Sequence, residues 1–233
     1  MAERADLLVI GGTSGIGRAI AASYADRGSS VIVAGRSAER AEEVAGELGD
    51  NVRGIAVDIS EPDEIAAQLE DVGPVGRLVL TAVGAGENSI ESFDPVVAAE
   101  LATAKLVGWP AVIAALGDRL GDDSSVLMFG GNAMDKPFPG SLGLTSVNGG
   151  VAHMVVSLAV EMAPRRVNAI HPGIVVDTPA WAEASDEFLE EVRGGTPTGT
   201  LITTGDIAAA AQLLLDHRAI TGQNLRVDGG SGL

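Results

Sequence analysis

The sequence contains no cysteine and only three histidines. The lack of cysteine excludes a disulfide framework, a thiolate nucleophile and thiolate metal ligands. The histidines are never clustered at the spacing of metal ligands, so we expect no metal site.

Long apolar runs, a targeting segment and positive charge are also scarce. No apolar run approaches the length of a membrane span, and residues 1–10 lack the basic start and the small-residue cleavage site of a signal peptide. The net charge is −17, with 15 Lys and Arg against 32 Asp and Glu, so nucleic acids and anionic membranes would be repelled. We therefore expect a cytoplasmic protein that acts on a small molecule, with acidic surface positions that keep it soluble.

Short β-branched runs alternate with helical segments along the whole chain. Nearly continuous apolar strands separated by helices indicate a parallel sheet covered on both faces. Right-handed crossovers then predict a doubly wound, Rossmann-type α/β fold with three layers and about seven strands. We interpret residues 1–233 as a single domain with a substrate flap near 178–205. The expected strands are 6–10, 30–35, 51–58, 76–83, 124–130, 165–171 and 224–230, and the expected helices are 17–28, 37–49, 61–70, 95–117, 145–163 and 206–216.

The stretch "VIGGTSGIGRAIA" carries a glycine-rich turn between the first strand and the first helix. Gly11, Gly15 and Gly17 follow the spacing G-x-x-x-G-x-G, a relative of the dinucleotide fingerprint. Glycine allows the tight turn and a close backbone approach, and the helix start offers free N–H groups to a pyrophosphate. The expected cofactor contacts from this turn are Gly11, Thr13, Ser14, Gly15, Ile16 and Gly17.

The end of the second strand indicates which dinucleotide binds. An acidic residue there would bond a ribose 2′-hydroxyl and favour NAD(H), but the run is Ala34-Gly35-Arg36-Ser37. Arg36 can grip a 2′-phosphate, and Ser37 can add a hydrogen bond. NADP(H) is therefore favoured over NAD(H); the alternative is that Arg36 is a solvated side chain at a strand end.

Several motifs occur in an order that resembles the short-chain dehydrogenase/reductase family over essentially the whole chain. They are the glycine spacing, "VDIS" after the third strand, "SLAVEMA" with "RVNAIHPG", and "TGQNLRVDGG". The resemblance implies a homodimer or homotetramer built from the helices at 95–117 and 145–163, with Gly149, Gly150 and Ala152 allowing close helix contact. It also implies further cofactor contacts at Asp58, Ile59, Ala82, Val83, Gly84, Pro172, Gly173, Ile174 and Thr178.

The family's four catalytic side chains are missing from the positions that the resemblance assigns to them. The tyrosine position is Leu144, the lysine position is Asn148, the serine position is Gly130 or Gly131, and the asparagine position is Lys105. Leucine cannot donate a proton, and glycine cannot hold a carbonyl group with a side chain.

Asparagine and lysine look exchanged, because Lys105 and Asn148 stand in each other's places. The sequence in this respect resembles a subgroup of the family with lysine on the fourth helix. Lys105 could then stabilise an oxyanion or give up a proton if burial lowers its pKa; the alternative is a surface or interface lysine. Asn132 is a third candidate, as a hydrogen-bond donor in place of the serine, although an asparagine there can simply cap a turn.

Three functions remain open from the sequence. The first is an NADP(H)-dependent oxidoreductase of the carbonyl or enone reductase type with altered proton-delivery groups. The second is a non-redox enzyme, such as a cyclase, dehydratase or isomerase, on the same fold. The third is a catalytically silent NADP-binding protein, and fold alone cannot choose among them.

Overall fold

A parallel sheet of seven strands forms the centre of the computed structural model, which describes residues 4–81 and 88–233. The strand order is β3-β2-β1-β4-β5-β6-β7, and every neighbouring pair is parallel. This confirms the predicted doubly wound α/β fold. The strands are β1 (Ala5–Ile10), β2 (Val31–Gly35), β3 (Val52–Ala56), β4 (Val75–Leu80), β5 (Leu120–Phe129), β6 (Arg166–Pro172) and β7 (Asn224–Val227).

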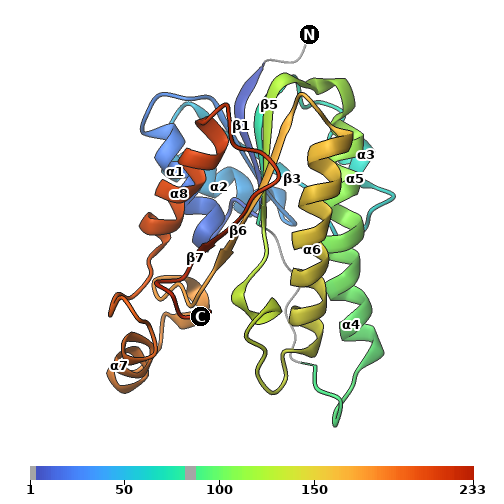
Figure 1. Cartoon of the computed structure of the whole chain (residues 1–233). Helices are drawn as coiled ribbons and strands as arrows, with labels where there is room; N and C mark the ends of the chain where they lie inside the picture. The colour runs from blue at the N-terminus through green and yellow to red at the C-terminus, as the bar shows by residue number, and fades with distance from the viewer. Residues whose placement is uncertain (1–3, 82–87) are drawn as a thin grey trace.

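Helices cover both faces of this sheet (Figure 1). One face carries α1 (Gly15–Ala25), α2 (Ala38–Leu48) and α8 (Thr204–Asp216). The other face carries α3 (Ile65–Gln68), α4 (Pro95–Ala102), α5 (Trp109–Leu116) and α6 (Leu142–Glu161). The short α7 (Asp186–Gly194) lies beyond the end to which the strands point, within the segment predicted as a flap (Figure 1). Because both faces are covered, strand residues such as Leu7, Leu8, Val9 and Ile10 are fully buried.

Some boundaries differ from the sequence expectation. Strand β5 begins at Leu120, before the expected 124, and α6 begins at Leu142, before the expected 145. Thr145 therefore lies inside the helix, where its hydroxyl donates to the carbonyl of Ala133 at 2.8 Å, and it does not cap the helix. The helix expected at 61–70 is only the single turn of α3.

The long helix expected at 95–117 is present, but its winding changes in the middle. Residues Thr103–Gly108 form a π-helical segment between α4 and α5. Pro110 is the second residue of α5, just after this segment, and it has no N–H for the carbonyl four residues earlier, against which its ring would also clash. The wider π turn accommodates this proline. Single π turns inside α-helices occur frequently at functional sites, and this one contains Lys105.

Two helical stretches are long and apolar enough to cross a membrane by length and composition, contrary to the expectation that no such run exists. They are Pro95–Arg119 and Leu142–Glu161. Helices of soluble proteins can pass the same test, and both pack on the sheet here (Figure 1). Gly150 is also close-packed within the chain, because a Cβ there would lie 2.8 Å from Leu106 Cδ2.

Candidate active site

The glycine-rich turn lies at the carboxyl end of β1, where parallel folds of this type bind ligands. Gly11 and Gly15 have φ angles of +89° and +49°, which favour glycine. A Cβ at Gly17 would lie 2.2 Å from the carbonyl oxygen of Gly11, so this position requires glycine for close packing. Ser14 precedes α1 in extended conformation, and its side chain makes no capping hydrogen bond. The backbone N–H groups that begin α1 are therefore open to an anion.

The segment after β6 closes over this turn. A Cβ at Gly15 would lie 3.6 Å from Pro179 Cδ and 3.7 Å from Thr178 Cγ2. The Thr178 hydroxyl donates to the carbonyl of Val175 at 2.9 Å, which fixes the bend. The structure thus brings Thr178, one of the expected cofactor contacts, beside the glycine turn. Pro172 ends β6, and Gly173 and Ile174 follow it at the same end of the sheet.

A hollow of about 420 Å³ opens at the end of β2, where the 2′-phosphate is expected. Its lining contains Arg36 and Ser37, two of the expected cofactor contacts, together with Thr13 and Gly35. Arg40 also lines the hollow, although it was not among the expected cofactor contacts. The spacing contained the signal, because Arg40 follows the N-cap residue Ser37 by three and lies on the first turn of α2.

Asp58 and Ile59, two of the expected cofactor contacts, have local structural partners. The Asp58 carboxylate accepts hydrogen bonds from the backbone and hydroxyl of Ser60, at 3.0 and 2.6 Å, and Ile59 is buried. A Cβ at Gly108 would lie 2.3 Å from the carbonyl oxygen of Ile59, so the π segment packs directly against this loop. Ala82, Val83 and Gly84 lie outside the described residues.

Lys105 and Asn148 meet, although they are far apart in the sequence. Lys105 Nζ donates to Asn148 Oδ1 at 2.8 Å and to the carbonyl oxygen of Phe129 at 3.0 Å. It also lies 5.3 Å from the centre of the Trp109 ring, within the range of a cation–π contact. Both Lys105 and Asn148 are 4% exposed. The alternative of a surface lysine is therefore wrong.

Burial lowers the pKa of the Lys105 ammonium from the usual 10.5 to about 7. No ion pair between described residues includes Lys105, so nothing there offsets the loss of hydration with a negative charge. A lysine in this state exchanges its proton near neutral pH, which is what a general acid or base requires.

The missing serine has a structural explanation. A Cβ at Gly130 would lie 2.1 Å from Nδ1 of His171, because the fully buried imidazole fills that space. A Cβ at Gly131 would likewise lie 2.9 Å from Asn148 Nδ2. The two glycines therefore admit side chains from β6 and α6 that a serine would exclude.

His171 holds the end of β5 in place. Its Nδ1 accepts from the Gly131 backbone N–H at 3.3 Å, so Nε2 carries the proton and donates to Asn224 Oδ1 at 2.8 Å. Burial lowers the pKa of His171, and the nearby Lys105 lowers it further, against the opposing effect of the Asn224 bond. These contacts agree with the structural role that the strand-end position suggests.

The Asn132 side chain is hydrogen-bonded to the C-terminal segment. Its Nδ2 donates to Asp228 Oδ2 at 2.6 Å and to Ser231 Oγ at 3.2 Å, while its buried Oδ1 has no hydrogen-bond partner within the described chain. Burial raises the pKa of Asp228, but bonds from Gly230, Asn132 and Gly232 outweigh it and lower the pKa overall. The Asn132 Nδ2 group therefore donates to the C-terminal segment. It could replace the serine as a donor to a substrate only if one of these hydrogen bonds broke.

The tyrosine position offers no acid. Leu144 lies one helical turn before Asn148 on α6 and is partly buried. The only tyrosine of the sequence, Tyr24, bonds Asp216 at 3.0 Å near the end of α8, and burial raises its pKa. In the segment predicted as a flap, Trp181 and Phe188 stack on each other with ring centres 5.0 Å apart.

Comparisons with known proteins agree with this geometry. Residues 11–232 match the family described as "Enoyl-(Acyl carrier protein) reductase". The chain is 30% identical over 243 residues to 3-oxoacyl-[acyl-carrier-protein] reductase FabG of Aquifex aeolicus, covering 96% of this chain and 95% of that protein.

Solved structures are similar over nearly the full length. The 3-ketoacyl-(acyl-carrier-protein) reductase from Brucella melitensis complexed with NADH is 28% identical with a TM-score of 0.84, covering 98% of each chain. The MalC Reductase/Diels-Alderase from Malbranchea aurantiaca is 25% identical with a TM-score of 0.88, covering 99% of this chain and 96% of that one. This chain belongs to the short-chain dehydrogenase/reductase family of oxidoreductases.

Proposed function

We propose that this protein is an NADP(H)-dependent carbonyl or enone reductase in which Lys105 takes the place of the tyrosine acid. The observation that carries the proposal is the buried contact of Lys105 Nζ with Asn148 Oδ1, at 2.8 Å. Lys105 stands where the family pattern has asparagine, and Asn148 stands where it has lysine. The two side chains are in direct hydrogen-bond contact.

The residues at the carboxyl end of the sheet fit a 2′-phosphorylated dinucleotide. The glycine turn packs its backbone closely, since a Cβ at Gly17 would clash with the Gly11 carbonyl oxygen, and the start of α1 presents uncapped N–H groups. Arg36 and Arg40 line the hollow where the 2′-phosphate would lie, and their guanidinium groups suit a phosphate dianion. When bound, the nicotinamide supplies or accepts a hydride.

Lys105 has the donors that proton delivery requires. An ammonium group carries three N–H donors, and the carbonyl of Phe129 and the amide of Asn148 accept two of them. The third N–H remains for the carbonyl oxygen of a substrate. In reduction, Lys105 would give its proton to that oxygen and become a neutral amine, which burial already favours. Asn148 would act as a positioning residue, because it orients the ammonium without carrying charge.

The substrate should be a ketone, enone or 3-oxoacyl compound whose carbonyl Lys105 can reach. The family serine has no replacement at Gly130, and Asn132 is engaged with Asp228. Lys105 would therefore both orient and protonate the carbonyl. We further propose that segment 178–205 is a flap over the cofactor turn, since Thr178 already borders Gly15.

We propose a homodimer or homotetramer as the working form. Val107 is 51% exposed on the π segment, and Val156 and Val160 are 52% and 76% exposed on α6. Such apolar positions on the two long helices suit burial against a second copy.

The decisive experiment is hydride transfer from deuterated NADPH to a panel containing an enone, a quinone, a simple ketone and a 3-oxoacyl thioester. We expect stereospecific deuterium incorporation into at least one member. Lys105→Met should lower turnover at least about tenfold while the affinity for NADPH changes less. The matched control is Lys136→Met, because Lys136 is the other lysine of the sequence and is exposed. Unaltered turnover of Lys105→Met would remove Lys105 from the mechanism.

A non-redox reaction is the second candidate. The relative described as MalC Reductase/Diels-Alderase carries two activities in its name, and Leu144 in the tyrosine position makes the site less polar. Tight NADPH binding without deuterium transfer to any panel member would favour this candidate over reduction.

A further inference from the structure

A large hollow lies at the end of the sheet where the strands start, opposite the glycine turn. It has a volume of about 630 Å³ and is lined by the starts of β4 and β6, by β5 and by the end of α8. Because the strands are parallel, all of them start on one side of the molecule and end on the opposite side (Figure 1). This hollow is therefore separate from the proposed cofactor and substrate site.

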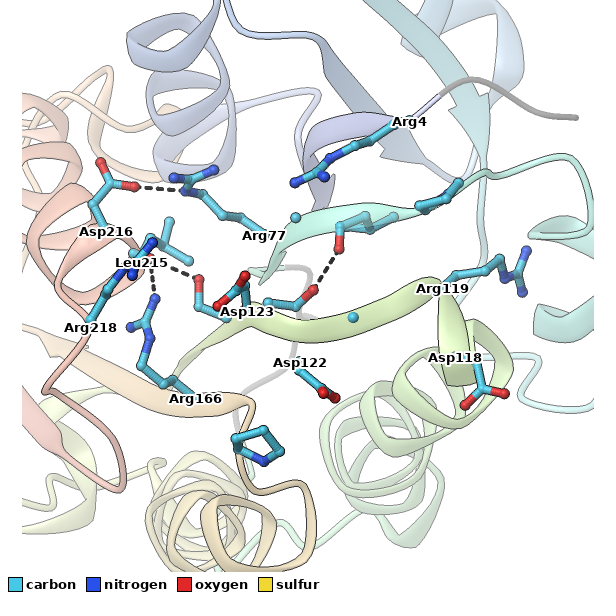
Figure 2. A pocket seen from close by; sticks show the side chains of 17 residues that line it. Arg4, Arg77, Asp118, Arg119, Asp122, Asp123, Arg166, Leu215, Asp216 and Arg218 are labelled. Atoms are coloured by element: carbon cyan, nitrogen blue, oxygen red, sulfur yellow. Dashed lines mark hydrogen bonds and ion pairs between the residues drawn. The ribbon is translucent and has the colours of Figure 1, made fainter.

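Its lining is rich in arginine for so acidic a chain. Of the 15 Lys and Arg residues in the sequence, five line this one hollow, and all five are arginines. Figure 2 shows Arg77, Arg166 and Arg218 gathered around Leu215 and Asp216 at one side. Arg119 and Asp118 lie at the other side of the hollow (Figure 2). We call Arg77, Arg166 and Arg218 the arginine corner.

Asp216 supplies the carboxylate that pairs with the arginine corner. Asp216 Oδ1 accepts from Arg77 Nε at 2.7 Å and from the Tyr24 hydroxyl at 3.0 Å, and its Oδ2 accepts from Arg27 at 3.3 Å. Two cationic groups already share this carboxylate, so it cannot neutralise the corner. Burial lowers the pKa of the Arg166 guanidinium, and the charges of Arg77 and Arg218 lower it further. The crowding of like charges leaves a positive field for an anion to neutralise.

The corner also has hydrogen-bond donors to spare. Arg166 uses Nη1 and Nη2 on the carbonyls of Leu214 and Leu215, at 2.8 and 2.6 Å, where it caps the end of α8. Arg77 uses only Nε, which leaves both of its Nη groups open. Within the described chain the exposed Arg218 makes no hydrogen bond or ion pair, so its whole planar fork is free. Free guanidinium forks of this kind bind phosphate oxygens in pairs.

The rest of the lining limits the size of the anion. Asp122 and Asp123 also line the hollow, and no ion pair between described residues includes either of them. Their carboxylates would repel a polyanion such as a nucleic acid, which favours a small anion with a single phosphate group. We propose that the arginine corner binds one phosphate group, either free phosphate or that of a small phosphomonoester.

Isothermal titration calorimetry with inorganic phosphate and with glycerol phosphate tests this site, at constant ionic strength set with potassium chloride. We expect saturable binding of one phosphate group per chain. Equal binding of the two probes would identify the phosphate group itself as the ligand, and binding of glycerol phosphate alone would identify the ester. The absence of saturable binding by either probe would overturn the proposal.

Variants locate the bound phosphate. Arg218→Ala removes an exposed side chain that makes no hydrogen bond or ion pair with the described residues, so the protein should fold with an unchanged urea midpoint. We expect this variant to weaken phosphate binding at least about tenfold, the usual effect of losing a charge-assisted hydrogen bond. Arg53→Ala, an exposed arginine on β3, is the matched control and should bind as the parent does.

The cofactor hollow is the competing location. If Arg36→Ala abolished phosphate binding while Arg218→Ala left it intact, the anion would lie at the cofactor hollow and the proposal would be wrong. NADPH affinity, measured separately, should not respond to Arg218→Ala. Failure of this site would thus leave the proposed reductase function untouched, and failure of that function would leave this site untouched.

Discussion

The burial of Lys105 makes the stability of this protein depend on pH in a way that one substitution can remove. The folded state lowers the lysine pKa from 10.5 to about 7, so the unfolded chain binds more protons throughout that interval. Stability must then rise with pH between the two values, since protons favour the state that binds them more strongly. Below about pH 7 both states are protonated, and the folded state carries the full penalty of a buried charge.

The magnitude follows from the two pKa values. A difference of one pKa unit corresponds to about 1.4 kcal/mol, so the complete interval corresponds to about 5 kcal/mol. Between about pH 7 and about pH 9, the linkage relation gives a rise of about 2 kcal/mol in the free energy of unfolding. The Lys105→Met variant lacks the titrating group and keeps a side chain of similar length. The stability difference between parent and variant should therefore change by about 2 kcal/mol over this range.

Urea unfolding at fixed protein concentration, followed at several pH values, measures this difference. Lys136→Met controls for the loss of a lysine, because Lys136 is exposed and only donates to the carbonyl of Ser231 at 2.6 Å. Since the sequence has two lysines, carbon-13 labelling at their ε positions also gives two assignable signals. The Lys105 signal should titrate near pH 7. Parallel stability curves for parent and Lys105→Met, with no signal titrating near neutrality, would refute the burial argument.

Three further outcomes are expected. The rate of carbonyl reduction should fall as pH rises through about 7, because the Lys105 ammonium then loses the proton it must donate, and a pH-rate profile of the parent with no such limb would contradict that role. Gly130→Ser should not restore the family serine but should destabilise the protein by about 1 to 3 kcal/mol in urea unfolding, because its Cβ would lie 2.1 Å from His171 Nδ1; a His171→Ala partner substitution should recover part of that loss. Arg36→Ala should raise the Kd of NADPH at least about tenfold and leave that of NADH nearly unchanged in fluorescence titrations, with Arg53→Ala as the control; an equal effect on both cofactors would contradict the 2′-phosphate assignment.

The sequence predicted the local parts of this structure well. Strand periodicity predicted the parallel sheet, and the spacing of Gly11, Gly15 and Gly17 predicted the turn. Both patterns depend on residues close together in the chain. Element ends were predicted less well, as at α6, whose start depends on contacts that the loop before it makes. The π segment was missed, although Pro110 inside the expected helix was its signal.

The roles of the candidate catalytic residues needed the fold. Asn132 resembled a donor by its position after β5, but its partner Asp228 lies 96 residues later, beyond the reach of any local pattern. His171, whose imidazole leaves no room for a serine side chain at Gly130, lies on another strand. From the sequence, the glycine at position 130 looked like the loss of a side chain, but in the structure the His171 imidazole occupies that space.

By itself the sequence determined the doubly wound sheet and its glycine-rich turn, because hydrophobic periodicity and glycine spacing act over a few residues. Only the tertiary structure decided that Lys105 is buried against Asn148, 43 residues away, and that arginines from two strands and the end of a helix share one corner. Burial and charge crowding set the proton affinity of a side chain, and both are properties of neighbours in space that the order of the residues does not state.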